Sequence, residues 1–152
     1  MIAAVSRPLA KHELKKSDKL SMPDIPLISI VDDDDAFRAS LENLIRSAGF
    51  RAQGFSSAES FLGSNKMHET ACMILDVRMR GTSGLELQSL IARANSHLPI
   101  IFTSAHADDD LRTQALEAGA VAFLYKPFYE EELLNAINAA LKGCEIKRWR
   151  RG

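Results

Sequence analysis

The chain has 152 residues, 46% of them hydrophobic and 26% charged, which is enough to bury the core of one domain. Its apolar runs are only strand-sized, so no membrane span is expected, and Arg7 and Lys11 come too early for a secretory signal peptide. The net charge of -1 conceals an acidic middle, residues 25–141, where nine Lys and Arg face sixteen Asp and Glu, which argues against nucleic-acid binding there.

The two ends differ from this middle because both are basic. Residues 1–24 mix Lys, Ser and Pro without a sustained period, and we expect a flexible N-terminal extension with at most a frayed helix at 11–20. We expect a folded domain over residues 25–142 and a basic C-terminal tail over residues 143–152. Cys72 and Cys144 lack the spacing of metal ligands and indicate a buried apolar side chain and a surface thiol. Such cysteines are typical of a reducing compartment, so we expect a cytoplasmic protein.

Short apolar runs alternate with helical patterns from Leu27 onward, which predicts βαβ units and a parallel sheet. The expected strands are residues 27–32, 50–55, 72–76, 99–104 and 121–125. Apolar residues at helical spacing predict a helix between each pair of strands and one after the last. Their expected inward residues are Phe37, Leu41, Leu44, Ile45 and Ala48; Phe61 and Leu62; Leu87, Leu90 and Ile91; and Leu133, Leu134, Ile137 and Leu141.

Helix boundaries carry recognisable signals. Ser56 with Glu59, and Ser83 with Glu86, have the spacing of capping boxes. Acidic residues at 108–110 and 130–132 suit the first turns of two further helices, because they complement the helix dipole. Gly49 and Gly119 are placed to end helices.

Polar side chains stand at the carboxyl ends of four of these strands, where open parallel sheets bind ligands. They are Asp32 and Asp33, Asp76, Ser104 and Lys126. Three carboxylates in one place cannot all ionise cheaply without a cation, and oxygen ligands of this kind are those that Mg2+ prefers. A carboxylate nucleophile, a divalent cation, a lysine and a hydroxyl are the parts needed to form an aspartyl phosphate.

Each of these residues has an ordinary structural interpretation when taken alone. Asp34 and Asp35 are interpreted as helix-capping and surface residues. Taken alone, Asp76 is typical of an aspartate in a turn. Ser104 alone is typical of a serine that is hydrogen-bonded at a strand end, and Lys126 alone of a solvated lysine at a strand end. Their joint occurrence at successive strand ends is what favours a single site.

Residues 27–142 closely resemble the CheY-like receiver domain of two-component response regulators. The matching motifs are Val31-Asp32-Asp33, Leu75-Asp76 followed by Met79 and Gly84, Ser104-Ala105, and Phe123 ahead of Lys126-Pro127-Phe128. The resemblance implies an α/β, flavodoxin-like (βα)5 doubly wound sandwich with a five-stranded parallel sheet of order 2-1-3-4-5.

The resemblance also implies roles for individual residues. Asp76 would be the phosphoacceptor, and Mg2+, or Mn2+ in its place, would be held by Asp32, Asp33, Asp76 and the backbone carbonyl of Arg78. Ser104 and Lys126 would bind the phosphoryl group, Phe123 is the aromatic that turns inward with the switch, and Ala105 follows the switch hydroxyl as a modulating position. The bond before Pro127 would be cis.

Two positions depart from the family pattern. Arg80 replaces the proline that usually follows the methionine after the acceptor, which predicts a freer loop, a cation near the site and altered autodephosphorylation or partner choice. Ser104 stands where threonine is commoner, a change that keeps the hydroxyl donor.

We therefore expect a stand-alone receiver that takes a phosphoryl group from a sensor histidine kinase or phosphotransfer protein. It would change protein partners, or form a homodimer, through the fourth helix, fifth strand and fifth helix at residues 107–141. It would not be an enzyme beyond self-phosphorylation and autodephosphorylation. Only ten residues follow Lys142, and their charges fit a solvated end, a contact with nucleic acid, an acidic partner or a membrane, or the start of a linker.

Two alternatives stay open. The chain could be the receiver part of a larger DNA-binding transcriptional regulator whose output domain lies outside this sequence. It could also be a magnesium-dependent phosphatase or phosphotransferase that uses Asp76 as its nucleophile. A phosphatase of the haloacid dehalogenase type would want an acid two residues after the nucleophile, where this chain has Arg78. His106, two residues past Ser104, is interpreted as a loop histidine beside the site.

Overall fold

The computed structural model describes residues 24–94 and 97–151, with the side chains of residues 144–151 left aside. A single parallel sheet has the order β2-β1-β3-β4-β5, as the family resemblance implies. Its strands are β1 (Leu27–Val31), β2 (Arg51–Phe55), β3 (Thr70–Asp76), β4 (Ile100–Ser104) and β5 (Ala122–Tyr125). The helices are α2 (Asp35–Ser47), α3 (Ala58–Gly63), α4 (Gly84–Arg93), α5 (Asp109–Glu117) and α6 (Glu130–Arg151).

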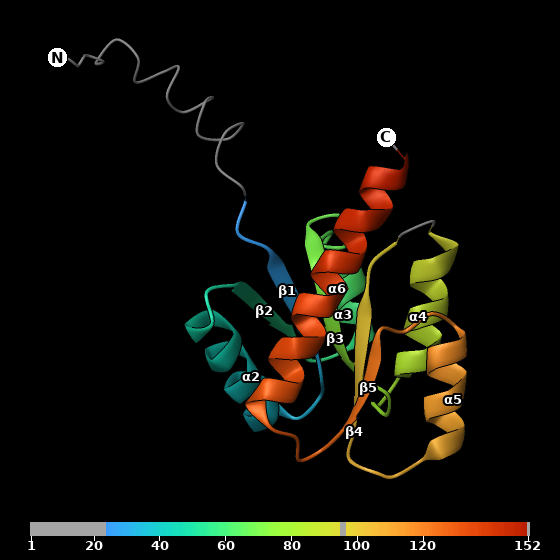
Figure 1. Cartoon of the computed structure of the whole chain (residues 1–152). Coiled ribbons are helices and arrows are strands. Elements are labelled where there is room, and N and C mark those ends of the chain that lie inside the picture. Colours follow the sequence, from blue (N-terminus) through green and yellow to red (C-terminus); the bar gives the residue numbers. More distant parts are fainter. Residues whose placement is uncertain (1–23, 95–96, 152) are drawn as a thin grey trace, which may run out of the picture.

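The helices form one layer on each face of the sheet (Figure 1). Helices α2 and α6 cover one face and bury Leu41, Ile45, Leu133 and Ile137 against it. Helices α3, α4 and α5 cover the other face around Phe61 and the inward side chains of the strands. The central strands β1 and β4 are buried along their whole length, as expected for strands covered on both faces, whereas the edge strand β2 is buried only at Phe55. The doubly wound architecture that the resemblance implies is confirmed.

Several helix boundaries follow the predicted signals. Asp34 caps α2 by accepting from Phe37 N, and Ser83 and Glu86 form the expected capping box of α4. Asp108 caps α5 through Leu111 N. Gly119 has a φ of +104°, which suits glycine at the end of a helix.

One capping prediction is wrong. Ser57, not Ser56, caps α3, because its side chain accepts from Ser60 N. The start of the helix therefore lies one residue later than predicted, and Glu59 is released from a capping role. Its carboxylate instead accepts hydrogen bonds from the backbone N and hydroxyl of Thr82, across in the β3–α4 loop, and these bonds lower the pKa of Glu59.

Three predicted core positions are also wrong. Leu62 and Leu90 are 37% and 39% exposed, and Ala48, the C-cap of α2, is exposed. On the short helix α3, Phe61 takes the fully buried position, and Leu62, about 100° further round the helix, lies at the exposed side. On α4 the buried stripe instead includes Gln88, whose Nε2 donates to the Ala115 carbonyl of α5 at 3.1 Å.

The last helix is longer than predicted. Glu130, Glu131 and Glu132 form its first turn as expected, but it continues to Arg151 and includes most of the segment predicted as a basic tail. It extends past the end of the sheet in Figure 1. The predicted extension at residues 1–24 lies outside the described residues apart from Asp24. None of the described helices has the length and apolar character needed to cross a bilayer.

Candidate functional site

Three carboxylates meet at the carboxyl edge of the sheet. Asp32 and Asp33 directly follow β1, and Asp76 ends the adjacent strand β3. One carboxylate oxygen from each lies within 4.8 Å of the other two. Asp32 and Asp76 are 1% and 7% exposed, and Asp33 is partly buried. The parallel pairing of β1 with β3 thus places acids far apart in sequence into one buried cluster.

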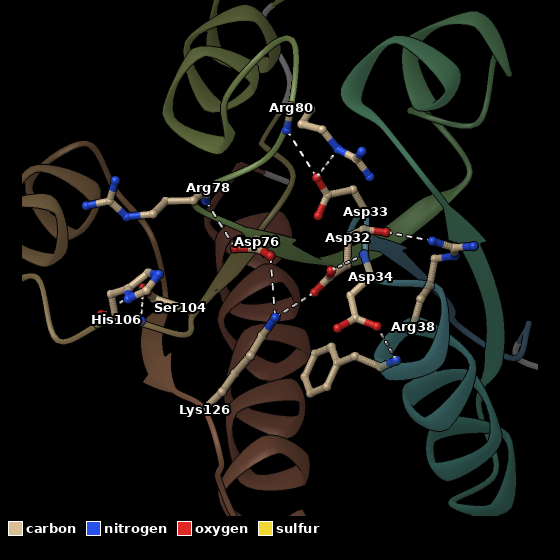
Figure 2. A network of polar contacts seen from close by, with 11 residues as sticks. Asp32, Asp33, Asp34, Arg38, Asp76, Arg78, Arg80, Ser104, His106 and Lys126 are labelled. Carbon is tan, nitrogen blue, oxygen red and sulfur yellow. Dashed lines mark hydrogen bonds and ion pairs between the residues drawn. The ribbon is translucent and has the colours of Figure 1, made fainter.

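Lys126 reaches the same cluster from the end of β5. Its Nζ lies 2.9 Å from Asp32 Oδ2 and 3.4 Å from Asp76 Oδ2, between the two carboxylates (Figure 2). The Nζ also stands 4.0 Å from the centre of the Phe37 ring, a cation–π contact, and Phe37 is braced edge-on by Phe128. The Lys126–Pro127 peptide bond is cis, as the resemblance implies.

The backbone that carries Asp32 is held by a residue that the sequence analysis did not select. Arg38 Nη1 donates to the Asp32 carbonyl at 2.7 Å, and Nη2 pairs with Asp35. The Asp32 carboxylate itself accepts from Asp34 N at 2.9 Å. Arg38 lies six residues after Asp32, one turn into α2, and that spacing was the only available signal for its role.

The Asp76 carboxylate sits in an environment that disfavours its charge. Burial raises its pKa above the ordinary value of 3.8, and the neighbouring Asp32 charge adds to the shift. The hydrogen bond from Arg78 N to Asp76 Oδ1, at 3.0 Å, and the Lys126 ammonium act in the opposite direction. The ionised form of Asp76 is therefore stabilised by any further positive charge placed beside it.

Asp76→Asn is therefore expected to raise the free energy of unfolding at neutral pH in magnesium-free buffer. Because the folded-state pKa of Asp76 lies above the unfolded value, its ionised form destabilises the folded protein, and this penalty fades as the pH falls through the folded pKa toward 3.8. Urea unfolding from neutral pH down to about pH 4 should show the advantage of the variant shrinking. An advantage that grows on acidification would contradict this account.

The β3–α4 loop bears two arginines that point in different directions (Figure 2). Arg78 Nη2 pairs with Asp108 at 2.6 Å, away from the carboxylate cluster. Arg80 turns toward Asp33: its backbone N donates to Asp33 Oδ2 at 3.1 Å, and its Nε lies 3.5 Å from the same oxygen. The loop expected to be freer without proline is thus tied at Arg80 to the acidic pair.

The two predicted switch residues lie beside the cluster without joining it. Ser104 ends β4 and is buried, and its hydroxyl bonds within its own turn, donating to the His106 carbonyl at 2.8 Å and accepting from His106 N. Phe123 is buried on β5, stacked on Phe102 and edge-on to Tyr125. Ala105 follows Ser104 and is exposed. Among the described residues, no hydrogen bond joins Ser104 to Asp76.

The donor set suits a hard divalent cation. Three carboxylates converge within 4.8 Å, and carboxylate oxygens are the ligands of Mg2+ and Mn2+. Two of the three are almost fully buried, where unshared negative charge is costly. Asp32, Asp33 and Asp76 could therefore hold a metal ion.

Comparison with known proteins decides the family. The sequence model of the response regulator receiver domain matches residues 28–138. The chain belongs to the response regulator receiver family. Receiver domains of this family take phosphate from kinases, bind Mg2+ at an acidic pocket and act as phosphoacceptors in two-component signalling, not as conventional enzymes.

Curated relatives and solved structures agree with this assignment. Over 80% of the chain it is 46% identical to Nodulation protein W of Bradyrhizobium diazoefficiens. Over 76% it is 47% identical to the response regulator protein TmoT of Ectopseudomonas mendocina. These alignments cover 54% and 53% of those proteins, so the receiver chain spans about half the length of these relatives.

Two solved structures share its fold at substantial identity. The response regulator StyR matches with a TM-score of 0.77 and 41% identity, over 84% of this chain and 65% of that one. The crystal structure of FixJ-N matches with a TM-score of 0.72 and 32% identity, over 80% of this chain and 96% of that one.

Proposed function

We propose that this receiver domain accepts a phosphoryl group on Asp76 and thereby switches its protein contacts. The observation that carries the proposal is the position of Asp76. It ends β3 beside Asp32 and Asp33, with Lys126 Nζ 3.4 Å from its Oδ2. No acid follows two residues later, where Arg78 stands with its side chain paired to Asp108, which disfavours the phosphatase alternative.

The chain's own groups prepare the carboxylate for reaction. Arg78 N donates to Asp76 Oδ1 and orients the group, and Lys126 Nζ supplies a donor for an oxygen of the incoming phosphoryl group. An Asp76 oxygen forms the new O–P bond as the P–N bond of a donor phosphohistidine breaks, and the released imidazole nitrogen regains a proton from water. The donor would be a sensor histidine kinase or a phosphotransfer protein, in the cytoplasm.

The proposed metal ligands are Asp32, Asp33, Asp76 and the backbone carbonyl of Arg78, with Mg2+ as the ion and Mn2+ as its substitute. When bound, the ion would supply positive charge for the carboxylates and for phosphoryl oxygens. Asp32 is pre-positioned for this by Asp34 N and by Arg38 on its carbonyl.

The proposed readout is a change at the surface formed by α5, β5 and α6, residues 107–141. Ser104 would exchange its bond to the His106 carbonyl for one to the phosphoryl group. Phe123 lies on the neighbouring strand β5, where it is stacked on Phe102 of β4. Tyr125 joins β5 to α5 through Asp109 at 3.1 Å. Phosphorylation would bias a two-state element, and this surface would then bind a downstream protein or a second copy of the chain.

A second candidate concerns the output. Relatives of this chain include transcriptional regulatory proteins such as FixJ of Azorhizobium caulinodans, 37% identical over 79% of the chain. This supports a role as the input domain of a larger transcriptional regulator, with the same phosphorylation chemistry. Binding of nucleic acid would then belong to that regulator's output part and not to the acidic receiver surface.

Intact-protein mass spectrometry after incubation with acetyl phosphate and Mg2+ tests the proposal. We expect one phosphoryl group on the wild type, none on Asp76→Asn, and none when a chelator removes the metal. Asp110→Asn, which changes an exposed carboxylate of the first turn of α5, is the matched control and should be phosphorylated normally.

If the wild type gains no phosphoryl group, either the site is not competent or the phosphorylated form hydrolyses rapidly. Binding of beryllofluoride distinguishes these two explanations. Stable binding of this phosphoryl mimic would indicate a competent site with rapid hydrolysis. Absence of both the adduct and beryllofluoride binding would overturn the assignment of Asp76.

A further inference from the structure

Residue 80 interacts with a proposed metal ligand in a way that the usual residue of the family could not. The family usually has proline at this position, whereas this chain has Arg80. Both contacts to Asp33 depend on the replacement, because the backbone N–H donates to Asp33 Oδ2 at 3.1 Å and Nε lies 3.5 Å from that oxygen. Proline has neither an N–H nor a cation.

With Arg80 in place, every carboxylate of the cluster has a cation supplied by the chain. Lys126 serves Asp32 and Asp76, at 2.9 and 3.4 Å, and Arg80 serves Asp33. A divalent ion that uses Asp33 must share or displace the donors already on Oδ2. It must also approach a guanidinium of like charge, which costs free energy at short range.

We propose that Arg80 competes with the divalent cation for Asp33 and so weakens the affinity of this site for Mg2+. The inference rests on the proposed function, since it takes Asp33 as a metal ligand. Arg80, together with the metal ligands, would then determine the Mg2+ concentration at which Asp76 can be phosphorylated. Arg80 is a positioning residue here, acting on the site through Asp33.

The size of the effect follows from the exposure of the pair. The Arg80 side chain is 90% exposed and that of Asp33 is 26% exposed, so the ion pair is weak and sensitive to salt. Removing the guanidinium should therefore tighten Mg2+ binding by about two- to fivefold at low ionic strength. Because exposed charges are screened, the difference should narrow in high salt.

Calorimetric titration of the full chain with MgCl2 alone, without a phosphodonor, measures the effect. Arg80→Ala removes the guanidinium and keeps the N–H, and Arg80→Pro removes both donors. We expect the dissociation constant for Mg2+ to be highest for the wild type, lower for Arg80→Ala and lowest for Arg80→Pro. Arg93→Ala makes the same change of charge at the far, exposed end of α4 and should leave it unchanged.

A second readout tests the competition without relying on the heat of binding. Loss of Arg80 leaves Asp33 short of a cation, so saturating Mg2+ should raise the melting temperature of Arg80→Ala more than that of the wild type. Asp33→Ala should lose most of the magnesium response in either background.

The outcomes separate this inference from the proposed function. Equal magnesium affinity in the wild type and Arg80→Ala, with binding still dependent on Asp33, would overturn the role of Arg80 and leave the acceptor site standing. No Asp33-dependent binding in any of the proteins would overturn the inference together with the proposed metal ligands. The identity of the acceptor is decided separately, by the mass of Asp76→Asn.

Discussion

Gly84→Ala is expected to lower the free energy of unfolding by about 3 kcal/mol, the upper part of the range for overpacking a tight site. Gly84 is the first residue of α4, and it is buried. A Cβ there would clash with the Asp76 carbonyl oxygen, lie 2.9 Å from Val77 Cα and 3.1 Å from the Phe102 ring. Two of these neighbours are backbone, which cannot rotate away, so α4 or the end of β3 must move.

The same change should weaken the site. Gly84 N donates to the Val77 carbonyl at 3.1 Å, which closes the loop between β3 and α4 immediately after Asp76. A displaced loop would shift Asp76 and the Arg78 carbonyl together. We expect weaker Mg2+ binding and slower phosphorylation in whatever fraction of Gly84→Ala remains folded.

Urea unfolding of Gly84→Ala and Gly63→Ala provides the comparison. Gly63 ends α3 and a Cβ there meets nothing within 4 Å, so its replacement should be neutral or stabilising by up to about 1 kcal/mol. If Gly84→Ala unfolded at the same urea concentration as the wild type, the close approach of α4 to the Asp76 carbonyl would not be a real constraint.

The parts of the site that could be predicted from sequence are those set by topology. Alternating strand and helix patterns imply a parallel sheet, and residues that follow successive strands must then gather at one edge. That reasoning placed Asp32, Asp76 and Lys126 together, and the structure joins them through contacts of 2.9 and 3.4 Å. This reasoning requires only the positions at which the strands end, and the apolar runs in the sequence locate those positions well.

The direction of long side chains could not be predicted in this way. Arg80 was expected to place a cation near the site, and its side chain does lie there, but the pairing of its Nε with Asp33 was not predicted. Phe37 was expected only as a core residue of its helix, but its ring also lies under the Lys126 ammonium. Each of these contacts depends on rotamers on two elements at once, which no periodicity in a single segment encodes.

Helix phase was the other source of error. A capping pattern that begins one residue early still predicts a helix, but it assigns the wrong side chains to its cap. This is what happened at Ser56, where Ser57 is the cap and Glu59 reaches Thr82 instead. The predicted burial of Leu90 is wrong for a related reason. Leu90 lies at the edge of the buried face of its helix, and the burial of an edge position depends on which helix packs beside it.

Lys126→Met is expected to reduce phosphoryl incorporation from acetyl phosphate by about a hundredfold or more, the loss typical of removing a donor aimed at developing charge. Methionine keeps the length and packing of the stem while it removes the ammonium. The lost group is the one that lies between Asp32 and Asp76, at 2.9 and 3.4 Å from their oxygens. An unchanged rate of incorporation would remove Lys126 from the proposed chemistry.

Stability should respond to the same change, since Lys126→Met leaves two buried carboxylates without their cation. In magnesium-free buffer at neutral pH we expect a loss of about 3 kcal/mol, the lower end for a broken buried pair because Lys126 is still 16% exposed. Lys66→Met is the matched control, because Lys66 pairs at the surface with Glu69 and its loss should cost under about 1 kcal/mol.

Magnesium distinguishes electrostatic loss from damage to packing in Lys126→Met. If the variant is unstable because negative charge is uncompensated, saturating Mg2+ should restore much of the lost free energy and should bind more tightly than to the wild type. If Phe37 and its neighbours have instead collapsed into the space of the Lys126 stem, magnesium would restore little. Urea unfolding with and without Mg2+ therefore reports whether Lys126 and the metal supply the same positive charge to one pair of carboxylates, Asp32 and Asp76.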